Sequence, residues 1–159
     1  MTFNNLNDLF KKIENDIQDT MRNEVADTVK ANMAEAIQTS VYSVYSPEYY
    51  NRRMNNGGLS DTHNMKVTEI QNGVSVHNAA PLDNGRNDYD LDDIIVNRGV
   101  LGYPHGRDFY SETVEELSEN KEHMQALKDG LKKRGYEVKW TWKIIKQRNV
   151  KFSPNTQMW

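Results

Sequence analysis

The sequence predicts an α+β fold: a long N-terminal helix, a small antiparallel sheet with a β-hairpin, a second helix and a C-terminal strand. Three observations lead to this prediction. Apolar residues recur every four positions through the first forty residues, two alternating segments flank an Asn-Gly pair, and a second helical pattern precedes another alternating run. Periods of about 3.6 and about two residues are those of helices and strands. The length of 159 residues fits one domain with a core of its own.

The first helix is predicted from Asn5 to about Ser40. Its apolar stripe consists of Leu9, Ile13, Ile17, Met21, Val25, Val29, Met33, Ile37 and Val41. A strict four-residue step drifts around a helix that has about 3.6 residues per turn. We therefore expect this helix to bend, to break or to contact different partners along its length. Asn5 or Asn7 can cap its start.

The hairpin is predicted from two alternating runs, Met65–Ile70 and Val74–Ala79, which are joined by Gln71-Asn72-Gly73. Asn-Gly between alternating runs is a strong short-range hairpin signal. A polar, acidic loop follows at 81–93. The short apolar run 94–96 fits either a third strand or one helical turn, and 97–107 is rich in glycine and is predicted to be loop.

The second helix is predicted from Ser111 to about Arg134, with acidic residues in its first turn and Gly135 as its C′ residue. The residues from Tyr136 to Lys143 then alternate between apolar and polar, which predicts a strand. We divide the chain into an α+β domain at 1–135 and a C-terminal strand and docking tail at 136–159. Phe152 and Trp159 in this tail would suit docking on a neighbouring subunit.

The segment between the first helix and the hairpin, residues 41–61, is rich in aromatic and arginine side chains. It contains Tyr42, Tyr45, Tyr49, Tyr50, Arg52, Arg53, Gly57 and Gly58. Pro47 prevents the helix from continuing unperturbed. Tyrosine and arginine dominate the hot spots of protein interfaces, so we expect a contact surface at the end of the helix. The alternative is that Tyr42 and Tyr45 merely pack the helix against the sheet.

Charge is distributed unevenly along this polar chain, which has a mean hydropathy of −0.87. Residues 41–120 hold six basic and thirteen acidic side chains, whereas residues 121–159 hold ten basic and three acidic ones. An acidic body beside a basic tail suggests stacking of subunits by charge complementarity, or contact with nucleic acid. The chain has no cysteine and no long apolar segment. These features exclude a disulfide framework and lead us to expect assembly in the cytosol, without a membrane.

Nothing in the sequence resembles an active site, and we expect neither a cofactor nor a metal ion. His63 and His77 flank the hairpin but lack the spacing of a metal motif, and they match an HNH nuclease poorly. The acidic residues of 83–93 depart from the EF-hand pattern. Phosphate-binding and dinucleotide-binding signatures are missing. The loop arginines are Arg52, Arg53, Arg86, Arg98 and Arg107, and these could face carboxylates of a partner or a DNA backbone.

The order of these features resembles the minor structural proteins of long-tailed bacteriophages. The similar segments are VYSVYSPEYYNRR, GGLSDTHN, a hairpin that ends in VHNAAP, and PHGRDFYSETVEELSENKEHMQALKDGLKKRG. They cover about residues 5–135, and Asp108 stands where these proteins often have proline. The similar proteins are tail-completion or head–tail joining (neck) proteins. The resemblance implies a non-enzymatic α+β subunit of the virion that forms a homo-oligomeric ring between connector and tail tube, with DNA passing through it.

From the chain and this resemblance we predict a set of contact residues, with Phe109 anchoring the start of the second helix and the tryptophans docking the tail. The set is Tyr45, Tyr49, Tyr50, Arg52, Arg53, Phe109, Trp140, Trp142 and Trp159. Two other functions remain open at this stage. One is a phage-encoded inhibitor that binds a host protein through its acidic loop. The other is a nucleic-acid-binding protein or nuclease that uses the arginines and the basic tail.

Overall fold

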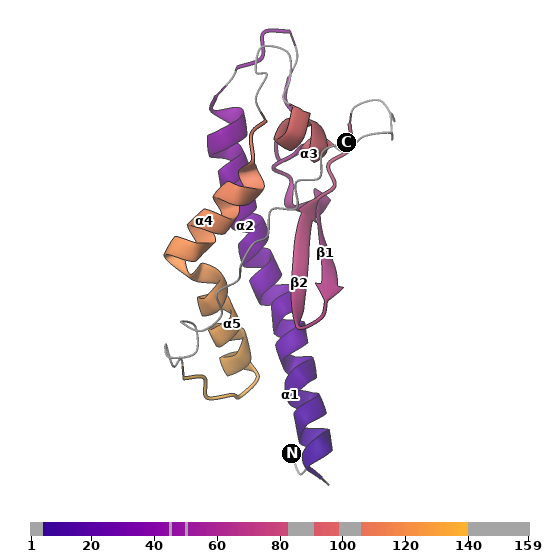
Figure 1. Cartoon of the computed structure of the whole chain (residues 1–159), viewed down its shortest axis with the longest axis vertical. Helices are drawn as coiled ribbons and strands as arrows, with labels where there is room; N and C mark the ends of the chain where they lie inside the picture. The colour runs from indigo at the N-terminus through magenta and orange to yellow at the C-terminus, as the bar shows by residue number, and fades with distance from the viewer. Residues whose placement is uncertain (1–4, 45, 50, 83–90, 99–105, 140–159) are drawn as a thin grey trace, which may run out of the picture.

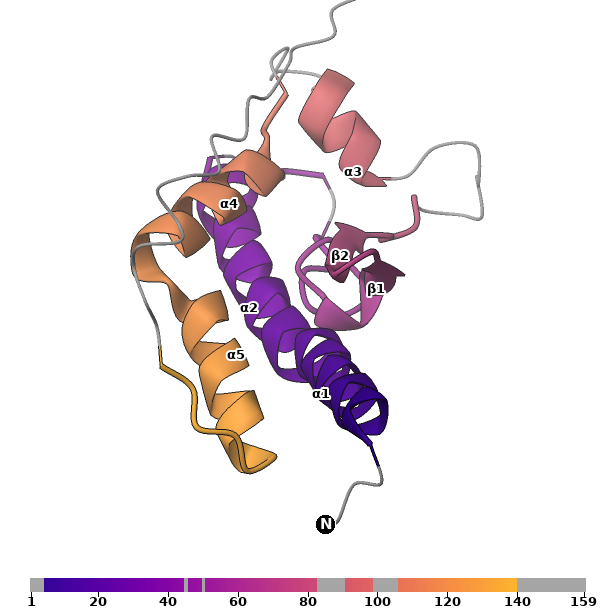
Figure 2. The same cartoon turned by 60° about the horizontal axis from the view of Figure 1, so that its bottom comes forward.

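A computed structural model of the chain describes residues 5–44, 46–49, 51–82, 91–98 and 106–139. One long helical rod runs through most of the length of the molecule (Figure 1). The helices α4 (Phe109–Asn120) and α5 (Glu122–Lys133) pack along one side of the rod, and the hairpin of β1 (Met65–Ile70) and β2 (Gly73–Asn78) packs along another side. A view from below shows the same arrangement, with the rod between the helical pair and the hairpin (Figure 2). The mixed α+β class predicted from the sequence is confirmed.

The rod consists of four helical segments in direct succession. They are α1 (Leu6–Thr20), the π-helical turn η1 (Met21–Val25), α2 (Ala26–Ile37) and the π-helical turn η2 (Gln38–Tyr42). The Asn5 side chain caps the start by accepting a hydrogen bond from the backbone N–H of Asp8 at 2.9 Å. The long N-terminal helix and its cap are therefore confirmed.

The two π-helical turns explain how the drifting apolar stripe of the rod is accommodated. In an α-helix each four-residue step advances the stripe by about 40° around the axis. A π turn takes an extra residue into one turn and so rotates the stripe back. Met33, Ile37 and Val41, at the C-terminal end of the stripe, are consequently all buried.

The core lies around the C-terminal half of the rod, where the hairpin, the loop after η2, α3 (Leu91–Asp93) and the start of α4 meet it. Its buried members are Met33, Ala36, Ile37, Val41, Leu59, Met65, Ala80, Ile95 and Phe109. Along α1, by contrast, the apolar residues are half-buried or exposed. One end of the molecule is therefore a packed domain, and the other is a helical arm with less cover (Figure 1).

The predicted hairpin is confirmed. β1 (Met65–Ile70) pairs with β2 (Gly73–Asn78) in antiparallel register from Met65 opposite Asn78 to Ile70 opposite Gly73. The two-residue turn between them needs a left-handed residue, and Asn72 supplies it at φ 61°.

The short apolar run at 94–96 is helical. It lies in the π-helical turn η5 (Ile94–Arg98), which directly follows α3 (Leu91–Asp93). Of the two readings open from the sequence, the third strand is wrong.

The second helix differs from the prediction because it is two helices, α4 (Phe109–Asn120) and α5 (Glu122–Lys133). Lys121 breaks them apart in a left-handed conformation at φ 59°. The buried Asn32 of α2 stabilises the break, since its side-chain amide bonds to Asn120 at 3.0 Å and to Glu122 at 2.9 Å.

The start of α4 also differs from the prediction. Asp108, not Ser111, is the N-cap, and its carboxylate accepts hydrogen bonds from the backbone N–H and the hydroxyl of Ser111 at 3.1 and 2.6 Å. These bonds lower the pKa of Asp108, the hydroxyl bond contributing most. Asp108 therefore has a structural role as the cap of α4.

Gly135 ends α5 as predicted, at φ 90°. Its N–H bonds to the carbonyl of Lys132 at 2.9 Å, and the N–H of Tyr136 bonds to that of Leu131 at 3.1 Å, which is the Schellman arrangement. Tyr136 to Lys139 form no strand, so the predicted C-terminal strand is wrong for these four residues. Tyr136 instead donates its hydroxyl to Asp16 of α1 at 2.5 Å. The rest of the predicted strand, including Trp140 and Trp142, lies outside the described residues.

Candidate interaction surface

The residues that follow the rod form a loop, 43–61, which folds back on the end of the helix. Arg52 donates a hydrogen bond to the carbonyl of Tyr42 at 2.6 Å, and its guanidinium lies over the Tyr42 ring at 5.1 Å from the centroid. Arg107 donates to the neighbouring carbonyl of Val41 at 3.2 Å. The last carbonyls of a helix lack partners within it and carry partial negative charge, so two guanidinium groups satisfy and stabilise this end. Arg52 and Tyr42 therefore contact each other within the chain at this end of the rod.

The second half of this loop is held by bonds within the chain. Arg53 donates to the carbonyl of Pro81 at 2.5 Å, which ties the loop to the exit from β2. Gly58 is required by close packing, because a Cβ atom there would lie 2.5 Å from the carbonyl oxygen of Met54. The side chain of Asn64 bonds back to the Gly58 carbonyl at 3.0 Å.

Asp61 joins the two ends of this turn. Its carboxylate accepts from the backbone N–H groups of Gly57 and His63 at 2.8 and 3.0 Å, and from the His63 ring at 2.9 Å. These hydrogen bonds, led by the one from the His63 backbone, lower the pKa of Asp61. The GGLSDTHN segment that carried the resemblance is therefore a structural motif.

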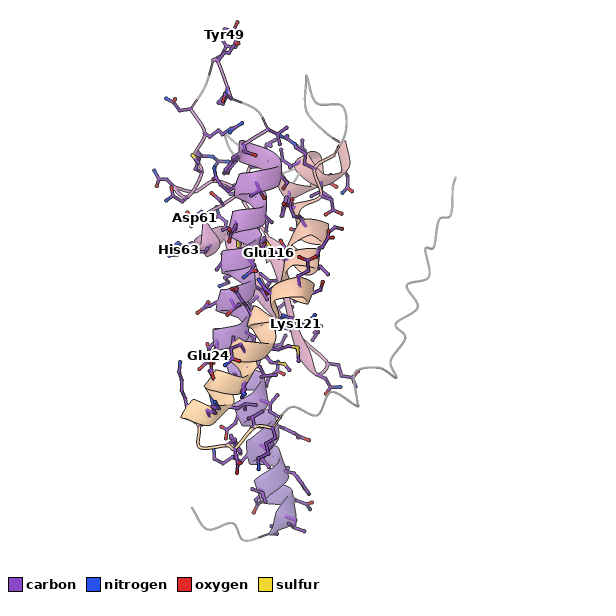
Figure 3. The ribbon with its side chains drawn as sticks, turned by 90° about the vertical axis from the view of Figure 1, so that its left-hand side faces the viewer. Glu24, Tyr49, Asp61, His63, Glu116 and Lys121 are labelled. Atoms are coloured by element: carbon purple, nitrogen blue, oxygen red, sulfur yellow. The ribbon has the colours of Figure 1, made fainter. Side chains whose placement is uncertain are left out.

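Tyr49 is the exception in this loop. Its side chain is 95% exposed, and it projects at the extreme tip of the molecule beyond the end of the rod (Figure 3). The nearby Val44 is also exposed, at 46%. Among the described residues of the loop, Tyr49 is the most exposed large apolar side chain, and a partner can reach it without disturbing the fold.

An acidic groove runs between the rod and α4, and sequence reasoning missed it. The groove is lined by Glu35, Thr39, Glu112, Glu115, Glu116 and Glu119. Burial raises the pKa of Glu116, and the neighbouring carboxylates of Glu35, Glu122 and Glu112 raise it further. The signal was present in the sequence, since the four glutamates of α4 follow the spacing of one helix face.

Of the remaining predicted contact residues, Phe109 is buried and the others lie outside the described residues. Phe109 is the first residue of α4 and is fully buried in the core, so its ring is not on the surface and does not belong to a contact surface. Tyr45 and Tyr50 in the loop, and Trp140, Trp142 and Trp159 in the tail, lie outside the described residues. Tyr49 is the predicted residue that the structure leaves open to a partner.

The two histidines of the hairpin region both lie at the surface. His63 is exposed and bonds to Asp61, whereas His77 points outward from β2 on an exposed face. Within these ranges, no three His, Asp or Glu side chains meet where they could hold a metal ion. In the same residues no helix has the length and apolar character needed to cross a bilayer.

A family model named YomN matches residues 5–133, from the cap of α1 to the last residue of α5. The chain belongs to the YomN family. This family is phage-derived, so its members include proteins encoded by bacteriophages. No curated protein and no solved structure matches the chain. The match to YomN covers every helix and strand of the described residues and leaves residues 134–159 outside.

Proposed function

We propose that this YomN-family chain is a non-enzymatic structural subunit of a bacteriophage virion, at the head–tail neck or at the tail terminus. It assembles as a homo-oligomeric ring in the host cytoplasm, contacts connector and tail-tube proteins, and lets DNA pass through without specific binding. The observation that carries the proposal is Tyr49. A tyrosine that is 95% exposed on a loop held from both sides contributes nothing to the chain's own core, and tyrosine is a typical interface anchor.

The distribution of charge supports assembly through unlike surfaces. Helix α4 carries four glutamates and no basic residue, whereas α5 carries three lysines and two acidic residues, with Arg134 directly after it. The two helices follow one another along the same side of the rod (Figure 1). A subunit with an acidic region and a basic region suits a head-to-tail contact, and such contacts close into rings when the rotation between subunits allows it. An acidic lining would also keep DNA phosphates from binding.

The experiment that tests this role is disruption of the gene in the phage that encodes it. The expected result is DNA-filled heads and separate tails in electron micrographs, with intact particles restored by the wild-type gene. Complementation with Tyr49→Ala should restore joining poorly, and Val114→Ala, which changes an exposed residue on α4, should restore it fully. Intact, infectious particles from the disrupted phage would overturn the proposal.

The acidic groove favours one alternative function, a phage-encoded inhibitor that binds a host protein. Glutamates at helical spacing can imitate a row of phosphates, and Glu112, Glu115 and Glu119 lie on one face of α4. A nucleic-acid-binding function has less support, because Arg52, Arg53 and Arg107 donate to backbone carbonyls of the chain itself. Capture of one host protein by the wild-type chain, abolished by glutamine at all three glutamates, would favour the inhibitor.

A further inference from the structure

The arm formed by α1 has an apolar face with little cover. Leu6 and Phe10 are 68% and 56% exposed, although they lie one turn apart on the same side of the helix. Ile13 and Ile17 continue this face and are half-buried. Exposed large apolar side chains that line up along a helix mark a surface that another segment covers.

The face continues directly beneath α5. Thr20, about one turn after Ile17 on the same side of the helix, is fully buried against Gly130 of α5. The cover by α5 stops there, because α5 ends at Lys133 and the chain turns at Gly135. The exposed part of the face is therefore the extension of a surface that the C-terminal part of the chain already covers.

Tyr136, three residues before the end of the described chain, contacts the arm beside this surface. The Tyr136 hydroxyl bonds to Asp16 at 2.5 Å, and Asp16 in turn pairs with Lys12 at 2.8 Å. From Asp16 back to Leu6 is about 15 Å along the helix, at about 1.5 Å per residue. About five extended residues span that distance, at about 3.3 Å each.

The residues that come next in the chain have the composition that such a face requires. Residues 140–159, named here the tail segment, contain all three tryptophans of the protein, two isoleucines, one valine and one phenylalanine. The segment carries four basic residues and no acidic one, whereas α1 carries four acidic and two basic residues. The apolar side chains of the tail segment suit the apolar face of α1, and its positive charge is opposite to the net negative charge of α1.

We propose that the tail segment docks on the α1 arm of its own chain and covers Leu6 and Phe10. The tether is short, so the effective concentration of the segment at this face is on the order of millimolar, above that of a second copy in dilute solution. Burial of two large side chains contributes through the hydrophobic effect, and the opposite charges favour the encounter. The inference does not depend on the proposed role in the virion.

Tryptophan fluorescence reports directly on this docking, because all tryptophans lie in the tail segment. In the full-length chain, Phe10→Ser and Leu6→Ser should shift the emission maximum to longer wavelength and increase quenching by iodide. Val114→Ser is the matched control, since Val114 is an equally exposed apolar residue on a different helix, at 67%. The result expected is a shift for both arm variants and none for the control. Identical spectra for wild type and both arm variants would overturn the proposal.

Disulfide trapping distinguishes the chain's own tail from that of a second copy, and the absence of native cysteines makes it specific. Phe10→Cys combined with Trp142→Cys should form a bond within one chain, which runs as a monomer on a non-reducing gel. The matched control pairs Val114→Cys with Trp142→Cys and should remain reduced. A disulfide requires Cα atoms within about 7 Å, so a product shows proximity. A covalent dimer, or no bond in the arm variant, would contradict docking within the chain.

Discussion

Gly130 determines how closely α5 approaches the rod. A Cβ atom at this position would lie 2.4 Å from the Cγ2 methyl of Thr20 and 3.2 Å from the Glu24 carboxyl carbon. The ion pair between Arg134 and Glu24, at 3.0 Å, also holds the end of α5 against the rod. The absence of a side chain at Gly130 is thus what brings helix and arm together.

We predict that Gly130→Ala destabilises the protein although alanine favours helix. The gain in helix propensity is about 1 kcal/mol, and forcing a methyl group into a closed contact costs about 1–3 kcal/mol. The net loss in the free energy of unfolding should be measurable by urea denaturation. Thr20→Ser removes the clashing methyl and keeps a hydroxyl that bonds to the Asp16 carbonyl at 2.6 Å. The double variant should therefore recover part of the loss, and strict additivity of the two changes would contradict this account.

Glu116 leads to a prediction about pH. Its pKa is raised above 4.5 by burial and by neighbouring carboxylates, so the folded chain holds this proton more tightly than the unfolded chain. Stability contributed by the protonated form is lost as pH rises from 4.5 through the folded-state pKa, and the deficit remains at neutral pH. Glu116→Gln should therefore raise the melting temperature at pH 7 and leave it nearly unchanged below about pH 4. Glu115→Gln removes a charge from an exposed position of the same helix and serves as control. A Glu116→Gln effect of the same size at both pH values would rule out the titration.

At the scale of elements, the loop after the rod contains residues with two different roles. Arg52 stabilises the fold, whereas Tyr49 is exposed to a partner. Arg52→Ala removes a charged donor from the end of the rod, where hydrogen bonds to charged groups contribute about 1.5–3 kcal/mol. We expect a clear fall in the midpoint of thermal unfolding for Arg52→Ala. Tyr49→Ala should leave that midpoint unchanged, because the side chain is 95% exposed. Equal destabilisation by both changes would show that Tyr49 belongs to the fold.

Sequence patterns correctly predicted the elements that are determined by residues close together in the sequence. The hairpin follows from Asn72 in its turn and from two alternating runs, and the end of α5 follows from Gly135 at a position that requires positive φ. The two π-helical turns were not predicted. The four-residue period of the apolar stripe indicated only that the first helix would depart from a regular α-helix or change its contacts along its length.

Tertiary contacts account for what the patterns did not predict. Lys121 is neither glycine nor proline, and the break there depends on Asn32, which is 88 residues or more from Asn120 and Glu122 in the sequence. Tyr136 to Lys139 form no strand, and the hydroxyl of Tyr136 bonds to Asp16 of the rod. At the interaction surface, exposure of Tyr49 and engagement of Arg52 both depend on how the loop folds back, which residue type alone does not determine.

For the whole molecule, the unequal charges of α4 and α5 lead to a prediction about assembly. If copies associate through these regions, their molar mass by light scattering should fall as salt is raised, because screening weakens contacts between exposed charges. Replacing Glu112, Glu115 and Glu119 by glutamine should lower the molar mass at low salt. Replacing Glu14, Asp19 and Asp27 of the rod by their amides removes the same charge elsewhere and should not. Assembly that is unaffected by salt and by the α4 variant would exclude α4 from the subunit contact.

The central claim is that the chain is a component of the virion, and quantitative mass spectrometry of purified particles tests it most directly. Particles of the encoding phage, separated from lysate by a density gradient, should contain the protein in a fixed ratio to the connector, at a small number of copies each. The ratio should survive high-salt washing, because subunits fixed between connector and tail are held by more than surface charge. Abundant protein in the infected cell together with its absence from washed particles would contradict the account.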